Sequence, residues 1–419
     1  MNPILPRNFF MADGEAHVYG GRLYLVGSTD ISGNKNYCSG EYHIWSTDDP
    51  RLVNWVDHGV VFRHTPDDPT VSWAPNALLY APDIAFKNGR YYLYICGSNR
   101  FEAVASSERI EGPYTDVRKI VHADGDSIDP AVFVDDDGQA YYLWGQFHLR
   151  GAKLKDNMSE IDECTLTDNI LTEQEHGFHE GASLRKINGK YYIVYTDISR
   201  GRATCMSYAV SDKPLGPYKK GGVIIDNTGC DPQTWNNHGS IQSFGGKWFV
   251  FYHRSSQNSR MSRRMCAEPI EILPDGSIPE VKMTSNGADD EINAFGEIDA
   301  SIASRMTGDL YITPDTERVG FEFLKNCGPG NRTEAWAEYR TVDFGDGAKT
   351  ISVKARGSGD VILMTERDGR IASICFDLDK SETKTAKLDV IPKGKQTVWL
   401  LFKGRGMDVF SFSFRAKSE

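Results

Sequence analysis

Short apolar runs and glycine-containing turns alternate along the chain in one recurring pattern. Its clearest copy is Ser127–Gly145, SIDPAVFVDDDGQAYYLWG. There Asp129 precedes the apolar run Ala131–Val134. The dipeptide Asp137-Gly138 then separates this run from a second one, Ala140–Trp144. Two β-prone runs joined by a turn dipeptide predict a β-hairpin.

The same order of polar residue, apolar strand, turn and aromatic strand occurs four more times. The further copies are Asp13–Gly27, Asp83–Cys96, Glu180–Thr196 and His238–His253. The first residues of the five copies follow one another at intervals of 46 to 70 residues. Blades of a β-propeller have four strands and recur at about 40–50 residues. Five copies with connections of variable length therefore predict a five-bladed β-propeller.

Further strands are expected to complete the blades. Tyr42–Ser46 is a candidate for the first blade, and Arg263–Leu273 together with Ser277–Met283 could close the fifth. The interval between the first and second copies is the longest, and its part Trp55–Asp83 is rich in aromatic residues and proline. We expect a loop there that reaches over the end of the propeller axis.

The pattern changes after the fifth copy. Residues 284–299 are polar and contain glycine, as linkers do. From about Ile302 to Phe414, short alternating strands recur without helical periodicity. The sequence therefore predicts an all-β chain with two domains, a propeller at residues 1–295 and a β-sandwich at residues 296–419.

Composition and charge exclude several classes of protein. The formal net charge of −11 lacks the basic footprint of a nucleic-acid-binding protein. No run approaches the roughly 18 apolar residues of a membrane span. The first ten residues lack the features of a signal peptide, so we expect the chain as given in the cytoplasm, or outside the cell if a leader was removed. The eight scattered cysteines disfavour disulfide and metal–thiolate frameworks.

The first residue of each copy carries the candidate chemistry. In a propeller these residues begin the innermost strands and converge near the axis; here they are Asp13, Asp83, Asp129, Glu180 and His238. Neighbouring carboxylates raise one another's pKa, which allows one to act as an acid and another as a base. Glycoside hydrolysis uses such a pair. A purely turn-forming role and a Ca²⁺ site are the alternatives that these residue types leave open.

Five strings resemble, in this order, the motifs of glycoside hydrolase family 43: ADGEAHVYGGRLYLVGS, YAPDIAFKNGRYYLYI, SIDPAVFVDDDGQAYYLWG, HEGASLRKINGKYYIVYTD and NNHGSIQSFGGKWFVFYHR. The resemblance covers about residues 3–283. It implies a five-bladed propeller that hydrolyses arabinosyl and xylosyl linkages with inversion. It further implies that Asp13 is the general base, Glu180 the general acid, and Asp129 the carboxyl that tunes this acid and orients the substrate. Asp83 matches none of the family's catalytic residues and is expected to be structural.

The resemblance also implies binding roles. His238 matches a histidine near the axis that contacts a hydrated Ca²⁺ in many members, so a structural Ca²⁺ is expected there, and no organic cofactor. Arg263 matches an arginine that contacts the sugar, with the adjacent Arg264 as its competitor. Trp73 and Tyr80 flank the predicted loop and are expected in the pocket wall.

The chain departs from the family patterns at several positions. Tyr80 stands where the family usually has Trp, and Gly14 replaces the Pro that usually follows the base; glycine tolerates the same turn. The second domain resembles a family 6 carbohydrate-binding module through AWAEYRTVDFGDGAKTISVKA and VWLLFKGRGMDVFSFSF. There Ser411 replaces the sugar-binding Asn, and SETKTAKLDV replaces a Trp-rich stretch. We expect the fold of the module to be kept and its sugar site to be lost.

The resemblance implies an exo-acting, inverting glycosidase that releases terminal α-L-arabinofuranose from arabinoxylan or arabinan oligosaccharides of the plant cell wall. A β-D-xylosidase, or a dual activity, is the second interpretation. An endo-arabinanase, which needs an open groove, is the third. Outside the enzymes, the alternative is a noncatalytic propeller that binds glycans or Ca²⁺.

Overall fold

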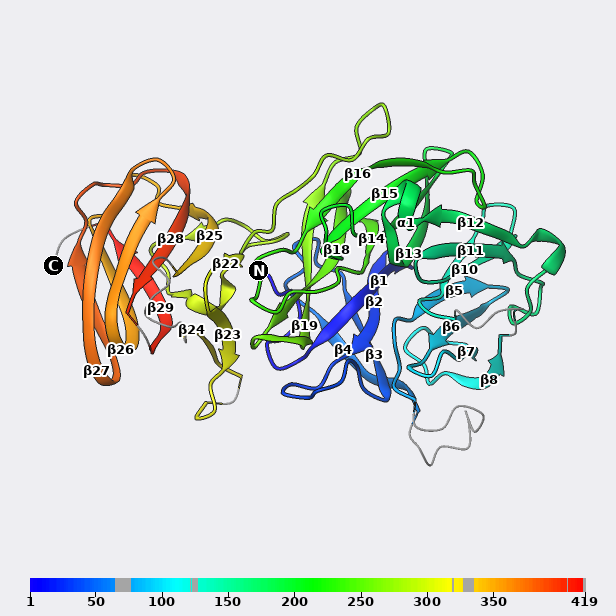
Figure 1. Cartoon of the computed structure of the whole chain (residues 1–419), viewed down its shortest axis with the longest axis horizontal. Coiled ribbons are helices and arrows are strands. Elements are labelled where there is room, and N and C mark those ends of the chain that lie inside the picture. The colour runs from blue at the N-terminus through cyan, green and yellow to red at the C-terminus, as the bar shows by residue number, and fades with distance from the viewer. Residues whose placement is uncertain are drawn as a thin grey trace.

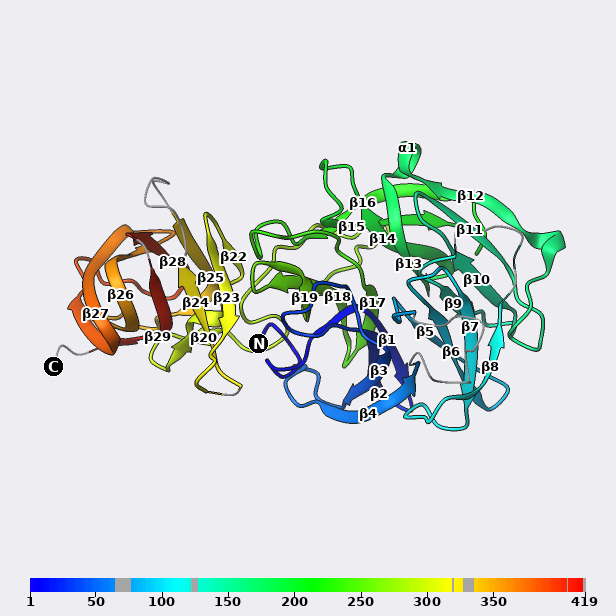
Figure 2. The ribbon, with the colours of Figure 1, turned by 60° about the horizontal axis from the view of Figure 1, so that its bottom comes forward.

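The computed structural model describes residues 1–64, 77–120, 122, 127–318, 320–326, 335–404 and 406–416. These residues form two all-β regions, a ring of five sheets and a curled C-terminal sheet, which lie side by side (Figure 1). In both views the N-terminus lies between the two regions (Figure 1, Figure 2). Helices are short, as in α1 Glu173–His176, and none in the described ranges is long and apolar enough to cross a membrane.

The five sheets of the ring are antiparallel and follow one another in chain order, which confirms the five-bladed propeller. The first four sheets have four strands each, and the fifth has three. The strands are β1 Met11–Tyr19, β2 Arg22–Thr29, β3 Glu41–Thr47, β4 Val56–Arg63; β5 Asp83–Lys87, β6 Arg90–Cys96, β7 Glu102–Ser107, β8 Thr115–Lys119; β9 Ala131–Val134, β10 Ala140–Trp144, β11 His148–Lys153, β12 Thr167–Thr172; β13 Phe178–Ile187, β14 Lys190–Asp197, β15 Cys205–Ser211, β16 Lys219–Asp226; β17 Ser240–Phe244, β18 Lys247–Ser256 and β19 Ser259–Ile270.

Turn chemistry explains why the two inner strands of each sheet pair as predicted. In four of the five hairpins both turn residues have positive φ, as in Asn88-Gly89 (53° and 77°) and Asn188-Gly189 (51° and 78°). Gly20-Gly21 and Gly245-Gly246 share this geometry. Type I′ turns need positive φ at both positions, which glycine and asparagine adopt at low cost. The local sequence therefore fixes the register of these hairpins.

Aromatic residues of the five sheets form the core between them. Each of the five sheets supplies one fully buried tyrosine. These residues are Tyr42, Tyr94, Tyr142, Tyr195 and Tyr252. The clusters around them draw on adjacent sheets, as where Ile44 of β3 packs in one cluster with Leu93 of β6. Aromatic side chains bury a large apolar area each, so this packing accounts for much of the ring's stability.

The first residues of the chain close the ring beside β19. Backbone N–H groups of Asn2 and Ile4 donate to the carbonyls of Ser285 and Met265, at 3.0 and 2.9 Å. The Asn2 side chain also donates to Glu268 at 2.8 Å. The fifth sheet therefore gains its outer partner from the opposite end of the propeller sequence.

The prediction of a strand at Ser277–Met283 is wrong. Residues 263–270 of the expected strand Arg263–Leu273 lie in β19, whereas residues 271–273 and the segment Ser277–Met283 form no strand. That segment runs beside β16, where Val281 N–H donates to Ile224 O at 2.8 Å. Pro279 within this segment has no N–H to donate, which prevents a regular ladder.

The C-terminal region is one hydrogen-bonded network of strands that curls over itself, in agreement with the predicted sandwich. Its long strand β26 pairs through residues 350–356 with β29 and through residues 360–365 with β28. Between them Gly357 has φ 105°, and a Cβ there would lie 2.0 Å from Gly406 O, so only glycine lets the strand cross between the layers. The strands are β20 Ile292–Asn293, β21 Ile298–Asp299, β22 Arg305–Met306, β23 Leu310–Pro314, β24 Glu322–Asn326, β25 Ala335–Asp343, β26 Thr350–Thr365, β27 Gly369–Lys387, β28 Lys395–Lys403 and β29 Met407–Arg415.

Candidate active site

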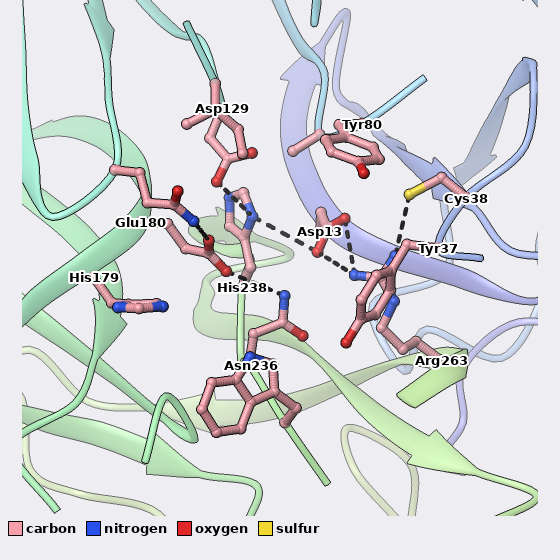
Figure 3. Close-up of a pocket in the computed structure, with 14 residues that line it drawn as sticks. Asp13, Tyr37, Cys38, Tyr80, Asp129, His179, Glu180, Asn236, His238 and Arg263 are labelled. Carbon is pink, nitrogen blue, oxygen red and sulfur yellow. Dashed lines mark hydrogen bonds and ion pairs between the residues drawn. The ribbon is translucent and has the colours of Figure 1, made fainter. Parts of the chain in front are cut away.

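Four of the five residues that begin the repeated pattern meet in one pocket of about 220 Å³. Figure 3 shows Asp13 beside Arg263 on one side, and Asp129 and Glu180 together on the other. The pocket is lined by Asp13, Tyr37, Cys38, Tyr80, Ala81, Ile128, Asp129, Gln146, His179, Glu180, Trp235, Asn236, His238 and Arg263. Asp83 is not among them, and Trp73 lies outside the described residues.

Irregularities in the strands place these carboxylates. The ladder between β1 and β2 shifts register between Ala12 and Glu15, and Asp13 within this shift has φ 56°. The ladder between β13 and β14 shifts on both sides of Glu180. Asp129, just before β9, has φ 52°. Bulges redirect side chains, and positive φ at residues other than glycine stores strain that clusters at functional sites.

Two glycines next to the carboxylates allow close packing. A Cβ on Gly14 would lie 2.3 Å from Met265 Cε, so the absent side chain lets Met265 of β19 pack closely against this residue. A Cβ on Gly181, which has φ 68°, would lie 2.7 Å from the ring of His238. The absent side chain lets this ring lie against the start of β13.

Asp13 is only 4% exposed, and two side chains donate to its carboxylate while two histidine rings lie close to it. Arg263 Nη1 donates to Oδ1 and Oδ2 at 3.0 and 3.2 Å, and Ser28 Oγ donates to Oδ2 at 2.5 Å. The Nδ1 atoms of His253 and His238 lie 3.5 and 3.6 Å from Oδ1. Burial alone would raise the pKa of Asp13, but these four neighbours, Arg263 foremost, outweigh it and lower the pKa to about 2. The carboxyl is therefore ionised at neutral pH.

Arg263 is held from two sides. Its Nε and Nη2 each donate to Asp30 at 2.9 Å, while Nη1 contacts Asp13. The ring of Tyr37 lies 4.9 Å from the guanidinium carbon. All three guanidinium nitrogens are thus directed at protein acceptors or sulfur, and the sugar contact expected from the sequence stays a prediction.

Asp129 and Glu180 have different surroundings. Neutral amides hold Glu180: Gln146 Nε2 donates to Oε2 at 2.9 Å, and Asn236 Nδ2 donates to Oε1 at 3.2 Å. Asp129 is 7% exposed, and burial, followed by the charges of Glu180 and Asp13, raises its pKa well above the ordinary value. This group of three carboxyls therefore retains a proton.

Metal-ligating atoms gather at a different place from the one expected. Within the described ranges, three such atoms lie within 4.8 Å of one another only at Glu15, His17 and Asp83. His17 Nε2 lies 2.7 Å from Asp83 Oδ1, and Arg185 donates to Glu15 at 2.9 Å. Ca²⁺ prefers about six to eight oxygen ligands, so this set does not fit it. His238 is outside the set, and its contact with Ca²⁺ stays a prediction.

Eight lining residues were not predicted from the sequence, namely Tyr37, Cys38, Ala81, Ile128, Gln146, His179, Trp235 and Asn236. Asn236 already stands in the string NNHGSIQSFGGKWFVFYHR, which Trp235 directly precedes, so extending that motif by one residue would have included both. The Trp235 ring lies 4.9 Å from the guanidinium carbon of Arg260 and 5.7 Å from that of Arg202. Tyr37 and Gln146 lie in loops, for which the strand pattern gives no signal.

Comparison with known proteins identifies the family. The model of the glycosyl hydrolases family 43 matches residues 1–278. A xylosidase/arabinosidase of Thermoclostridium stercorarium is 30% identical, over 97% of this chain and 96% of that protein. A second xylosidase/arabinosidase, from Humicola insolens, is 36% identical over 60% of this chain and 90% of its own length.

Solved structures agree with this assignment. A family 43 β-xylosidase/α-arabinofuranosidase from a compost microbial metagenome, described in complex with xylotriose in a calcium-free form, is 28% identical with a TM-score of 0.56, over 67% of this chain and 97% of that one. The arabinoxylan arabinofuranohydrolase of Bacillus subtilis, in complex with cellotetraose, is 22% identical with a TM-score of 0.58, over 99% and 97%. This second likeness concerns the fold alone, and the resemblance of the C-terminal region to a carbohydrate-binding module stays a prediction. The chain belongs to glycosyl hydrolase family 43 and is a glycosidase that hydrolyses O-glycosyl bonds.

Proposed function

We propose that this glycosidase releases terminal α-L-arabinofuranose, with inversion, from arabinoxylan or arabinan oligosaccharides, and that it cleaves terminal β-D-xylose as a second activity. The observation that carries the proposal is that carboxyls on the two sides of one pocket have neighbours of opposite charge. Asp13 lies against Arg263, whereas Asp129 lies beside Glu180. An inverting glycosidase needs one ionised carboxylate and one protonated carboxyl around the scissile bond.

Asp13 is the general base in this proposal. Its pKa of about 2 keeps it ionised, so it accepts a proton from a water on the sugar face opposite the leaving group. A carboxylate with so low a pKa is a weak base, which makes its orientation important. Arg263 and Ser28 supply that orientation because they hold both carboxylate oxygens.

Glu180 is the general acid, and Asp129 keeps a proton available to it. The raised pKa of Asp129 retains a proton beside Glu180, and in this proposal that proton passes to Glu180, which delivers it to the glycosidic oxygen. Gln146 and Asn236 fix the two oxygens of Glu180. Asp13 and Glu180 come from the first and fourth sheets, which allows the separation of about 6.5–9.5 Å that inversion requires for the attacking water.

The size of the pocket supports action on a chain end. Its volume of about 220 Å³ is below the roughly 300–1,000 Å³ of clefts that hold drug-sized ligands, which favours a single pentose. Tyr37, Tyr80 and Trp235 supply aromatic wall surface. Arabinofuranose and xylose present similar hydroxyls around the reacting carbon, and one apolar contact discriminates by only about 1–3 kcal/mol. The names of the relatives, xylosidase/arabinosidase, support the second activity.

A hydrolysis panel tests the proposal, with Asp13→Asn as the inactive control. We expect fastest release from an aryl α-L-arabinofuranoside, slower release from an aryl β-D-xyloside, and monomeric arabinose from linear arabinan from the start. Proton NMR during early turnover is expected to show a product of opposite anomeric configuration. An early ladder of oligomers would favour an endo-arabinanase, a faster xyloside would reverse the two activities, and a retained anomer would refute inversion.

A further inference from the structure

Strand β19 carries two adjacent arginines that point in opposite directions. Side chains alternate along a strand, so Arg263 reaches Asp13 in the pocket while Arg264 reaches Glu322 of β24 in the C-terminal region. Arg264, the alternative sugar contact in the sequence, does not line the pocket. One strand thus links the pocket to the second region of the molecule.

The ion pair between Arg264 and Glu322 is buried where the two regions meet. Both guanidinium Nη atoms donate to the two carboxylate oxygens, and the side chains are only 4% and 3% exposed. Within the described residues, Arg264 Nε has no hydrogen-bond partner, and Glu322 is the only carboxylate that forms an ion pair with Arg264. A buried arginine of this kind depends on the carboxylate with which it is paired.

Further contacts connect this ion pair with the pocket. The ring of Phe10 lies 5.0 Å from the guanidinium carbon of Arg264, and the Phe10 carbonyl accepts the backbone N–H of Asp30 at 2.9 Å. Asp30 is the residue that holds the pocket arginine. In addition, Gln257 N–H, in the turn before β19, donates to Ile312 O of β23 at 2.8 Å. The second region therefore contacts both the turn and the middle of the hairpin that reaches the pocket.

We propose that the C-terminal region positions Asp13, the general base. Glu322, through Arg264, fixes β19 so that Arg263 stays in contact with Asp13 and Asp30. The inference rests on the proposed role of Asp13 as the general base. Glu322 and Arg264 are positioning residues, because neither lines the pocket. Contacts alone do not show energetic coupling between the ion pair and the pocket. Coupling requires that a change at Glu322 alters a property of the pocket, such as the proton affinity of Asp13.

The expected readout follows from the groups that face Asp13. They are Arg263, His238, His253, Asp129, Glu180, Cys38 and Tyr42, with Asp30 behind Arg263. Arg263 is the cation that donates to both oxygens of Asp13. A looser contact raises the pKa of Asp13, so more of the base is protonated, and inactive, at acid pH.

The test uses Glu322→Gln in the full chain, with Asp408→Asn as the matched control. The control breaks an ion pair with Arg356 inside the C-terminal region, 2.6 Å long. We expect Glu322→Gln to lower kcat about tenfold with little change in KM. The ratio of kcat/KM at about pH 3.5 to that at about pH 6.5 is expected to fall about twofold or more, whereas Asp408→Asn leaves it unchanged. A smaller fraction of folded enzyme would lower kcat/KM at both pH values by the same factor and leave their ratio unchanged.

Two further measurements keep the test decisive. The double variant Arg264→Met/Glu322→Leu replaces the pair by apolar packing, which is often neutral or stabilising, and is expected to recover about half or more of kcat. Hydrogen exchange of residues 11–16 and 259–266 needs no substrate and is expected to speed up in Glu322→Gln but not in Asp408→Asn. Unchanged exchange and an unchanged pH ratio in Glu322→Gln would overturn the inference. An inactive wild type with faster exchange in Glu322→Gln would instead refute the proposed function alone.

Discussion

The two sides of the pocket hold carboxyls of similar burial and opposite proton affinity (Figure 3). Burial alone would raise the pKa of both Asp13 and Asp129. Asp13 faces Arg263, two histidines and Ser28, and its pKa falls to about 2. Asp129 faces the carboxyls of Glu180 and Asp13, and its pKa rises well above the ordinary value. Neighbouring charges, and not burial, therefore decide which carboxyl is ionised.

Ring closure produces this difference. Strand β1 begins the first sheet and packs against the strands of the fifth sheet, which supplies Arg263 from β19. Asp129 begins the third sheet and packs beside the fourth, whose innermost strand supplies Glu180. The repeated sheets therefore give their first residues different surroundings, because the first sheet meets the fifth where the ring closes.

Replacing Asp13, the proposed general base, is expected to have the largest effect. Asp13→Asn removes water activation, which every substrate needs, so kcat/KM should fall by about 10⁴ or more on natural and activated glycosides alike. A series of aryl glycosides with leaving groups of different acidity measures this loss. A residual rate that grows steeply with a better leaving group would contradict the assignment of Asp13.

Replacing Glu180, the proposed general acid, is expected to have a smaller effect that depends on the leaving group. Glu180→Gln should lower hydrolysis of arabinoxylan oligosaccharides by about 10²–10⁴, because the departing oxygen loses its proton donor. An aryl glycoside with a very good leaving group needs little protonation and should lose less. Wild-type rates on the oligosaccharides would show that another group is the acid.

The two sides should also differ in their effect on stability. The pKa of Asp13 is lowered from 3.8 to about 2. At pH values above 3.8 the ionised carboxylate therefore stabilises the fold by about 2 kcal/mol, and this contribution is lost as the pH falls toward 2. The raised pKa of Asp129 acts in the opposite direction: its contribution is complete at low pH and is lost as the pH rises.

Urea unfolding at neutral pH can measure this difference. Asp13→Asn is expected to lower the free energy of unfolding by about 1–2 kcal/mol, and Asp129→Asn to leave it unchanged or raise it. Both variants keep the size of the side chain, so each serves as the control for the other. A loss of similar size in both would show that the two carboxyls do not differ as described.

Local chemistry made the hairpins and the positions of the carboxylates predictable. Dipeptides such as Asn88-Gly89 specify their turns within the strand pattern itself. The ion pair between Asp13 and Arg263 joins residues 250 positions apart, and it exists only after the ring has closed. No local pattern could therefore reveal it. The same limit hid the raised pKa of Asp129, which depends on carboxyls from two other sheets.

The errors also have local causes. Ser277–Met283 has apolar residues at strand-like spacing, but Pro279 interrupts the hydrogen-bond ladder and the segment packs beside β16. The unpredicted pocket residues Tyr37 and Gln146 lie in loops, where side-chain positions depend on tertiary contacts.

The smallest expected effect comes from Ser28, whose buried hydroxyl donates to Asp13 at 2.5 Å. Ser28→Ala removes one of the groups that lower the pKa of Asp13, but Arg263 remains, so the base stays ionised at neutral pH. We expect kcat/KM to fall about two- to fivefold on all substrates alike, and more toward acid pH. Gln146→Ala, its counterpart beside Glu180, should give a loss that grows as the leaving group becomes poorer. If instead Ser28→Ala gave the loss that depends on the leaving group and Gln146→Ala the equal loss on all substrates, the roles of Asp13 and Glu180 would have to be exchanged.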